Sequence, residues 1–166
     1  FTVLSITGGG DAQSMAGGVS RATIPTMAGM VASQCGVPLM PAGLMHDNQF
    51  EPLSDVLPGV ACLGDLLHAR GYDLTYMGGA STKFAGKAKF YQGHGFDTAL
   101  GRDELEDKAP AGYLNDWGLY DDTLLGLAEK RIRHLHDSDK PYAFFGLTLA
   151  GHPPFGNPSQ SCIDNQ

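Results

Sequence analysis

One pattern occurs twice in this chain: a helix that turns directly into a short apolar strand. In the segment 62–78, CLGDLLHARGYDLTYMG, Leu63, Leu66 and Leu67 share one helical face, and Gly71 stands where a helix end favours a left-handed residue. The second unit begins with a helix whose apolar stripe consists of Leu124, Ala128, Ile132 and Leu135. A polar turn and a strand over 142–149 follow this helix. Helices that alternate with strands predict an α/β fold, a mainly parallel sheet flanked by helices.

Two further elements are predicted ahead of these units. The opening residues FTVLSI are rich in β-branched and aromatic side chains and predict a strand that ends near Ile6, followed by a loop up to residue 22. Thr26, which follows a proline, is expected to be the N-cap of a helix over about 27–35 that stops at Gly36. The segment 36–60 contains several prolines and predicts another loop.

The composition narrows the classes of function. A chain of 166 residues fits one domain, and 42% hydrophobic with 17% charged residues is ordinary for a globular protein. The net charge of −7, without a block of Lys and Arg, argues against a nucleic-acid partner, because phosphate contacts need clustered cations. Cys35, Cys62 and Cys162 form no CxxC pair, which argues against a zinc cluster and leaves one disulfide or none.

In parallel sheets the ligand crevice lies beyond the carboxyl ends of the strands. Three segments qualify here, at 7–26, 78–87 and 151–155, and unusual residues occur in each. The hydroxyl of Thr26 would meet free backbone N–H groups and the positive end of a helix dipole, which favour an alkoxide or a bound phosphate. An ordinary cap is the commoner role for such a threonine, and the local sequence favours it.

Two other side chains stand in the same kind of segment. His152 follows a predicted strand, and the prolines after it would hold the imidazole near the mouth of the crevice; packing against Phe155 is the alternative. Lys87 lies in a glycine-containing loop, where its ammonium could pair with a phosphate or simply be solvated. Both residues are therefore candidates for binding an anionic group.

The aspartates before the second helix are predicted to have structural roles, and the remaining histidines show no pattern of metal ligands. Asp116, Asp121 and Asp122 precede a helix, where aspartate serves as a cap and as a partner of the dipole. Trp117 and Tyr120 are interpreted as apolar anchors of that helix entry. The other histidines considered have no metal-ligand spacing with a carboxylate nearby; they are His94, His134 and His136.

Several blocks together resemble one family. These blocks are TMAGMVASQCGVPL (26–39), CLGDLLHARGYDLTYMGGASTKFAGKAKFYQGHGFD (62–97), NDWGLYDDT (115–123) and LTLAGHPPF (147–155). In unbroken order they closely resemble the periplasmic phosphoglycerol transferases, which modify osmoregulated periplasmic glucans and are similar to lipoteichoic acid synthases. Both groups belong to the alkaline phosphatase/sulfatase-like superfamily. The segment 7–21 matches no part of that pattern.

The resemblance implies roles for individual residues. The family's nucleophile, a metal-bound threonine at a helix N-terminus, falls on Thr26, with Thr23 as a weaker competitor. The residues that contact the phosphoglycerol group fall on His152 and Lys87, with Phe84 beside them. Lipoteichoic acid synthases have a tryptophan after that phenylalanine, whereas this chain has alanine, which agrees better with the glucan branch. The implied cofactor is a divalent metal, Mn2+ or Mg2+, with Ca2+ or Zn2+ as alternatives.

The resemblance also implies a donor, an acceptor and a place of action. The donor is phosphatidylglycerol, the acceptor a periplasmic glucan, and the site the periplasmic face of the bacterial inner membrane. The family's other metal ligands, an acidic residue and an Asp-His pair, have no match here, since the chain contains no Asp-His dipeptide. We therefore expect residues 1–166 to be an internal, inactive part of the catalytic domain, without its N-terminal membrane helices.

Two alternatives remain at this point. One is another enzyme of the superfamily, such as a phosphoethanolamine transferase or a sulfatase-like hydrolase, although TMAGM lacks the Cys or Ser context expected of a sulfatase nucleophile. The other is a non-catalytic α/β domain that binds glucan or a lipid headgroup, in which Thr26 is only a cap.

Overall fold

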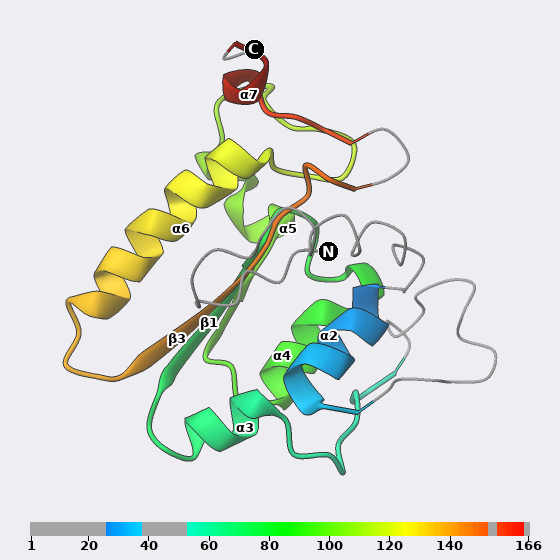
Figure 1. The fold of residues 1–166 in the computed structure, drawn as a ribbon, viewed down its shortest axis with the longest axis vertical. Helices are drawn as coiled ribbons and strands as arrows, with labels where there is room; N and C mark the ends of the chain where they lie inside the picture. Colours follow the sequence, from blue (N-terminus) through cyan, green and yellow to red (C-terminus); the bar gives the residue numbers. More distant parts are fainter. Residues whose placement is uncertain (1–25, 38–52, 153–155, 165–166) are drawn as a thin grey trace, which may run out of the picture.

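The computed structural model describes residues 26–37, 53–152 and 156–164 (Figure 1). Within these residues three parallel strands form one sheet in the order β2-β1-β3. The strands are β1 (Asp73–Gly78), β2 (Thr98–Leu100) and β3 (Tyr142–Leu147). The predicted α/β fold with a mainly parallel sheet is confirmed. The strand predicted at residues 1–6 lies outside the described residues.

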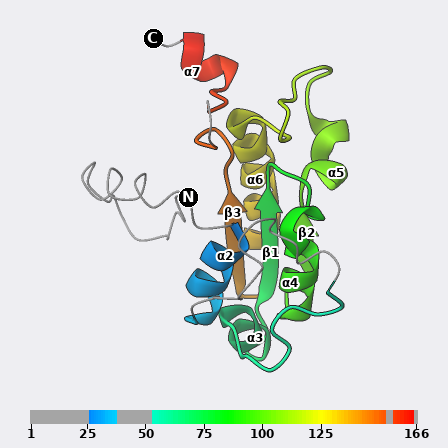
Figure 2. The ribbon, with the colours of Figure 1, turned by 90° about the vertical axis from the view of Figure 1, so that its right-hand side faces the viewer.

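Helices lie on both faces of this sheet. They are α2 (Thr26–Cys35), α3 (Leu63–His68), α4 (Lys87–Gly93), α5 (Arg102–Leu105), α6 (Asp121–His136) and α7 (Gln160–Asp164), with the 3-10 turns η1 (Phe84–Gly86) and η2 (Glu106–Lys108). In Figure 2, α2, α3 and α4 lie in front of the strands and α6 lies behind them. None of the helices in the described part is long and apolar enough to cross a membrane.

The central strand β1 divides the core into two clusters, because successive side chains point to opposite faces of a sheet. Leu74 and Tyr76 belong to the cluster under α2 and α4, together with Val31 and Phe90. Met77 belongs to the second cluster, whose other members include Leu124 and Ala128 of α6. The stripe predicted for α6 is thus largely confirmed, with Leu124, Ala128 and Leu135 buried and Ile132 partly exposed.

The face predicted for α3 is wrong. Leu63 and Leu66 are 39% and 50% exposed, and only Leu67 packs against the core. The helix instead presents Gly64 to the protein interior, where a Cβ atom would collide with the carbonyl oxygen of His94. The absent side chain lets α3 approach the backbone more closely than a leucine face would allow. Gly71 does adopt the predicted positive φ, at 80°.

A disulfide joins Cys35, the last residue of α2, to Cys62 just before α3, and Cys162 is a free, exposed thiol. His94 lies beside this bridge and is 3% exposed. Its Nδ1 is 2.8 Å from a carboxylate oxygen of Asp65, and its Nε2 is 2.9 Å from the carbonyl oxygen of Val56. The sequence offered no metal-ligand spacing for His94, and the carboxylate that it contacts, Asp65, is 29 positions away in the chain and close in the fold.

Candidate active site

The candidate residues gather where β1 and β3 end. The loop after β1 leads into η1, which begins at Phe84, and then into α4, which begins at Lys87. The loop after β3 leads to His152. Helix α2, which begins at Thr26, contacts η1. The side chain of Thr26 lies outside the described residues, so its role stays a prediction.

The sequence suggested that Lys87 lies in a loop, but in the structure it is the first residue of helix α4. Its side chain is only 1% exposed. The two residues directly before it, Ala85 and Gly86, have φ angles of 58° and 67°. These left-handed residues turn the chain sharply, and a non-glycine residue in this region costs about 1 kcal/mol. Backbone strain of this kind often occurs at functional sites. Because its side chain is buried, Lys87 is not solvated, and that alternative is wrong.

The ammonium of Lys87 stands over an aromatic ring and not beside a carboxylate. Its Nζ is 5.2 Å from the centre of the Phe84 ring, a cation–π distance. Burial lowers the pKa of Lys87 from 10.5 to about 8, and no carboxylate of the described residues opposes this effect. A buried cation without such a partner is suited to bind a negative group of a ligand.

Trp117 joins the two halves of the site, although the sequence had suggested only a structural anchor. Its ring centre is 4.1 Å from that of His152 and 6.2 Å from that of Phe84. Phe84, Trp117 and His152 thus form a continuous row, and Lys87 lies at the end marked by Phe84. The available sequence signal was that Trp117 is the sole tryptophan of the chain and stands in a loop. Tyr120, the other predicted anchor, stacks on Tyr113.

Backbone contacts fix the position of Trp117. The side-chain oxygen of Asn115 accepts hydrogen bonds from the N–H groups of Trp117 and Gly118, at 2.9 and 3.0 Å. Gly118 has a φ of 149° and pairs with Ala80 just beyond β1. A Cβ atom on Gly118 would collide with the carbonyl oxygen of Gly79, so glycine is needed for this close approach. The indole is therefore placed against the end of β1.

A carboxylate of α6 fixes the loop that carries His152. The two oxygens of Asp121 accept hydrogen bonds from the N–H groups of Leu149 and Ala150, at 2.7 and 3.0 Å. The N–H of His152 in turn donates to the carbonyl oxygen of Leu149, at 2.9 Å. The sequence predicted Asp121 as a residue that precedes this helix and caps it, whereas Asp121 is the first residue of α6 and its carboxylate holds the loop after β3. This contact orients the backbone that presents the imidazole.

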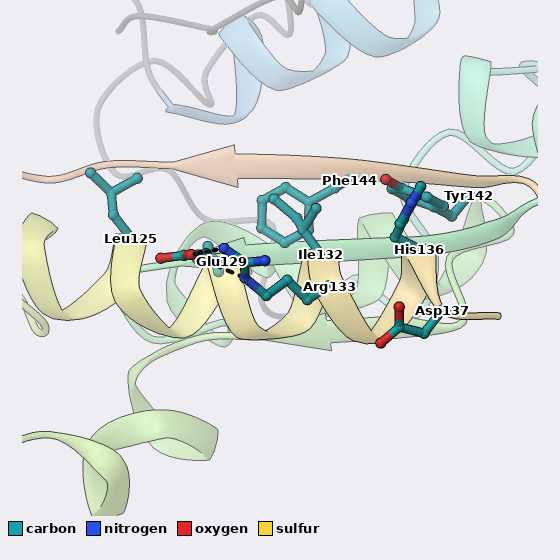
Figure 3. Close-up of a pocket in the computed structure, with 9 residues that line it drawn as sticks. Leu125, Glu129, Ile132, Arg133, His136, Asp137, Tyr142 and Phe144 are labelled. Carbon is teal, nitrogen blue, oxygen red and sulfur yellow. Dashed lines mark hydrogen bonds and ion pairs between the residues drawn. The ribbon is translucent and has the colours of Figure 1, made fainter.

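Two pockets lie in the described part of the chain near these elements. One, of about 410 Å³, is lined by both Phe84 and Trp117. The other, of about 560 Å³, lies between α6 and β3 and contains none of the candidate residues (Figure 3). Its lining includes Ile132 and Phe144, with Glu129 and Arg133 as an ion pair at its rim. The first pocket adjoins the candidate site.

The described residues do not form the implied metal site. Within the parts of the chain that the structure describes, one group of metal-binding side chains converges, consisting of Cys35, Cys62 and His94. Its sulfur atoms are joined in the disulfide and are therefore not available as thiolate ligands. A hard cation such as Mg2+ or Mn2+ also prefers oxygen ligands. Binding of a divalent metal by Thr26 remains a prediction.

A stability measurement can test the cost of burying Lys87. Below pH 8 the buried ammonium is charged in the folded and the unfolded chain, so its full desolvation penalty opposes folding. Lys87→Met should therefore raise the free energy of unfolding at pH 7 by about 2 to 3 kcal/mol, and this gain should shrink as pH rises from 8 to 10.5. Urea unfolding at pH 7 and at pH 10 measures both values.

The control for this experiment is Lys83→Met. The side chain of Lys83 is 80% exposed and forms a surface ion pair with Asp103, so its loss should change stability by less than about 0.5 kcal/mol at either pH. Destabilisation by Lys87→Met at pH 7 would contradict the claim that the buried ammonium opposes folding, because it would mean that the charge has a compensating partner.

Comparison with known proteins identifies the family of this chain. The sulfatase family model matches residues 19–165. Phosphoglycerol transferase I of Citrobacter koseri and that of Escherichia coli are each 43% identical to this chain over 138 residues, which is 82% of this chain and 18% of theirs. The chain thus spans less than a fifth of the length of these relatives, and the predicted similarity to phosphoglycerol transferases is confirmed.

Solved structures show the same fold. A protein in the alkaline phosphatase superfamily from Vibrio parahaemolyticus matches with a TM-score of 0.61 and 26% identity, over 78% of this chain and 30% of its own. The lipoteichoic acid synthase LtaP from Listeria monocytogenes matches with a TM-score of 0.52 and 17% identity, over 60% of this chain and 23% of its own. With the family model matching most of its length, this chain belongs to the sulfatase family.

Proposed function

We propose that this chain is part of an enzyme that transfers a phosphoglycerol group from phosphatidylglycerol to a hydroxyl group of a periplasmic glucan. The observation that carries the proposal is the buried ammonium of Lys87, placed over Phe84 at the end of the row that reaches His152. A phosphate group would supply the negative charge that this ammonium lacks among the described residues. The 43% identity to phosphoglycerol transferase I supports the choice of phosphoglycerol as the group transferred.

The proposed reaction has two substitutions at phosphorus. In the first, the oxygen of Thr26 bonds to phosphorus, the bond to the diacylglycerol oxygen breaks, and the threonine proton ends on the released diacylglycerol. In the second, a glucan hydroxyl oxygen bonds to phosphorus, the bond from phosphorus to the oxygen of Thr26 breaks, and the proton of the glucan hydroxyl ends on Thr26. The position of Thr26 at the start of α2 supports this role, because free N–H groups and the helix dipole favour negative charge there.

The other residues are proposed to bind the moving group. The ammonium of Lys87 would neutralise a phosphoryl oxygen, and burial strengthens that attraction. The imidazole of His152 would donate a hydrogen bond to the phosphoglycerol group, with its orientation kept by contact with Trp117. Because the pKa of Lys87 is about 8, binding of the donor should weaken as pH rises above that value and the ammonium loses its charge.

The remaining parts of the proposal concern the metal and the place of action. The metal is Mn2+ or Mg2+, and Thr26 is the residue of this chain proposed to bind it. We propose further that the reaction takes place at the periplasmic face of the bacterial inner membrane, and that this chain forms part of a longer catalytic domain. The disulfide between Cys35 and Cys62 is compatible with an oxidising compartment such as the periplasm.

Mass spectrometry of the trapped intermediate tests the proposed function. A protein of the relatives' length that carries this chain would be mixed with phosphatidylglycerol and Mn2+, quenched in acid and digested. We expect a glycerophosphoryl group on Thr26 and none on Thr23. A phosphoethanolamine or sulfate adduct with the corresponding donors would favour another enzyme of the superfamily. Absence of any adduct, with donor binding intact, would favour a non-catalytic binding domain.

A further inference from the structure

The pocket of about 410 Å³ beside the candidate site has a composition unlike that of the site itself. Its volume lies within the range of about 300 to 1,000 Å³ that is usual for small-molecule sites. One wall is aromatic, formed by Phe84 and Trp117. The charged residues of its lining are Arg102, Asp103, Glu106 and Asp116. The pocket thus combines an aromatic wall with an excess of carboxylates.

The charges of this pocket disfavour a phosphate. Three carboxylates against one guanidinium give a formal charge of −2 in the lining, and Lys83, which pairs with Asp103 from outside the lining, reduces this to −1. The guanidinium of Arg102 is already paired with Glu106, at 3.1 Å. A hydrogen bond from Ser81 and the ion pair with Lys83 hold the pKa of Asp103 below its usual value, so its carboxylate stays ionised at neutral pH. An anionic ligand would be repelled from this pocket, whereas the ammonium of Lys87 attracts one.

The same features suit a neutral ligand with many hydroxyl groups. Ionised carboxylates accept strong hydrogen bonds from hydroxyl groups. The rings of Phe84 and Trp117 offer apolar area to the C–H faces of a sugar ring. Asp116 is exposed, and the structure shows no ion pair or hydrogen bond that occupies its carboxylate within the described residues. Asp116 is therefore free to accept a hydrogen bond from a ligand.

We propose that this pocket binds a sugar unit of the acceptor, next to the phosphoglycerol group. Phe84 belongs to both places, since its ring lines the pocket and also lies under the ammonium of Lys87. A sugar against Phe84 and Trp117 would therefore have its hydroxyl groups close to a phosphate held by Lys87 and His152. That the sugar belongs to the acceptor rests on the proposed function, whereas the binding of a neutral sugar rests on the pocket alone.

Fluorescence can test this site, because Trp117 is the sole tryptophan of the 166 residues and lines the pocket. The chain of 166 residues would be titrated with cellotetraose, a neutral β-linked glucose tetrasaccharide, and separately with glycerol 1-phosphate. We expect a saturable change in tryptophan emission with cellotetraose. Asp116→Asn should weaken cellotetraose binding about fivefold, since a charged acceptor of the hydrogen bond is replaced by a neutral one. The same substitution should leave the affinity for glycerol 1-phosphate unchanged or improved.

The control is Asp107→Asn, which removes another exposed carboxylate, on η2 and outside the pocket. It should leave both affinities unchanged. Lys87→Met should weaken glycerol 1-phosphate binding and leave cellotetraose binding within about twofold, because the sugar pocket does not include Lys87.

The outcomes separate the two proposals. Glycerol 1-phosphate binding that depends on Lys87, without any binding of cellotetraose, would overturn the sugar site and leave the proposed function standing. Binding of cellotetraose that depends on Asp116, without binding of glycerol 1-phosphate, would support the sugar site and count against phosphoglycerol transfer. A response of Trp117 to Mg2+ that depends on Asp116, with no response to cellotetraose, would identify a cation site and overturn the inference.

Discussion

Replacing Thr26 with alanine should lower phosphoglycerol transfer by about 10⁴-fold or more, the effect usual for the loss of a catalytic nucleophile. The ten-residue helix α2 begins at this residue, where unpaired N–H groups and the helix dipole favour an attacking oxyanion. The fold should persist, because the residues that anchor α2, Val31 in the core and Cys35 in the disulfide, are unchanged. Initial rates with phosphatidylglycerol, measured in the protein of full length, give the effect.

Two further variants make this result specific to the hydroxyl at position 26. Thr26→Ser keeps a nucleophile and should retain part of the activity, whereas loss of a helix cap alone would lower stability by about 1 kcal/mol without such a loss of rate. Thr23→Ala should be close to wild type in rate. Normal transfer by Thr26→Ala, or loss of transfer by Thr23→Ala alone, would show that the assignment of the nucleophile is wrong.

The sequence pattern singles out those residues of the candidate site that follow directly from a strand. Lys87 and His152 come soon after β1 and β3, and the ends of parallel strands meet at one edge of a sheet, whereas Phe84 was predicted from the resemblance alone. Trp117 was missed as a member of the site because it follows no strand. A glycine contact between two loops places it there, and contacts of this kind leave no periodic signal in the sequence.

Local patterns were least informative where a single glycine or a short turn determines the packing. The leucines of α3 suggested an apolar face, but Gly64 allows the helix to pack on its opposite side. Lys87 is buried directly after the left-handed turn at Ala85 and Gly86, and the local sequence around a lysine in a glycine-containing loop does not indicate such burial. Strand β2 has only three residues and is stabilised by pairing with β1, so its sequence alone does not indicate a strand.

Removal of the disulfide should destabilise the fold considerably. Cys35 and Cys62 are separated by 27 positions, and closing a loop of this length in the unfolded chain corresponds to about 3 to 4 kcal/mol. Cys35→Ala combined with Cys62→Ala, or reduction of the wild type, should therefore lower the free energy of unfolding by about that amount. Urea unfolding with and without dithiothreitol measures the change. The double variant should not respond to the reductant.

Loss of this bridge should also lower the rate of phosphoglycerol transfer, because the bridge joins the end of the helix that begins at Thr26 to the start of α3. A freer α2 would place the attacking oxygen less accurately, and small misplacements of reacting groups lower rates by about tenfold or more. Cys162→Ser is the matched control, since that thiol is free and exposed, and it should change neither stability nor rate. If the reduced wild type unfolds at the same urea concentration as the oxidised protein, the bridge does not stabilise this fold.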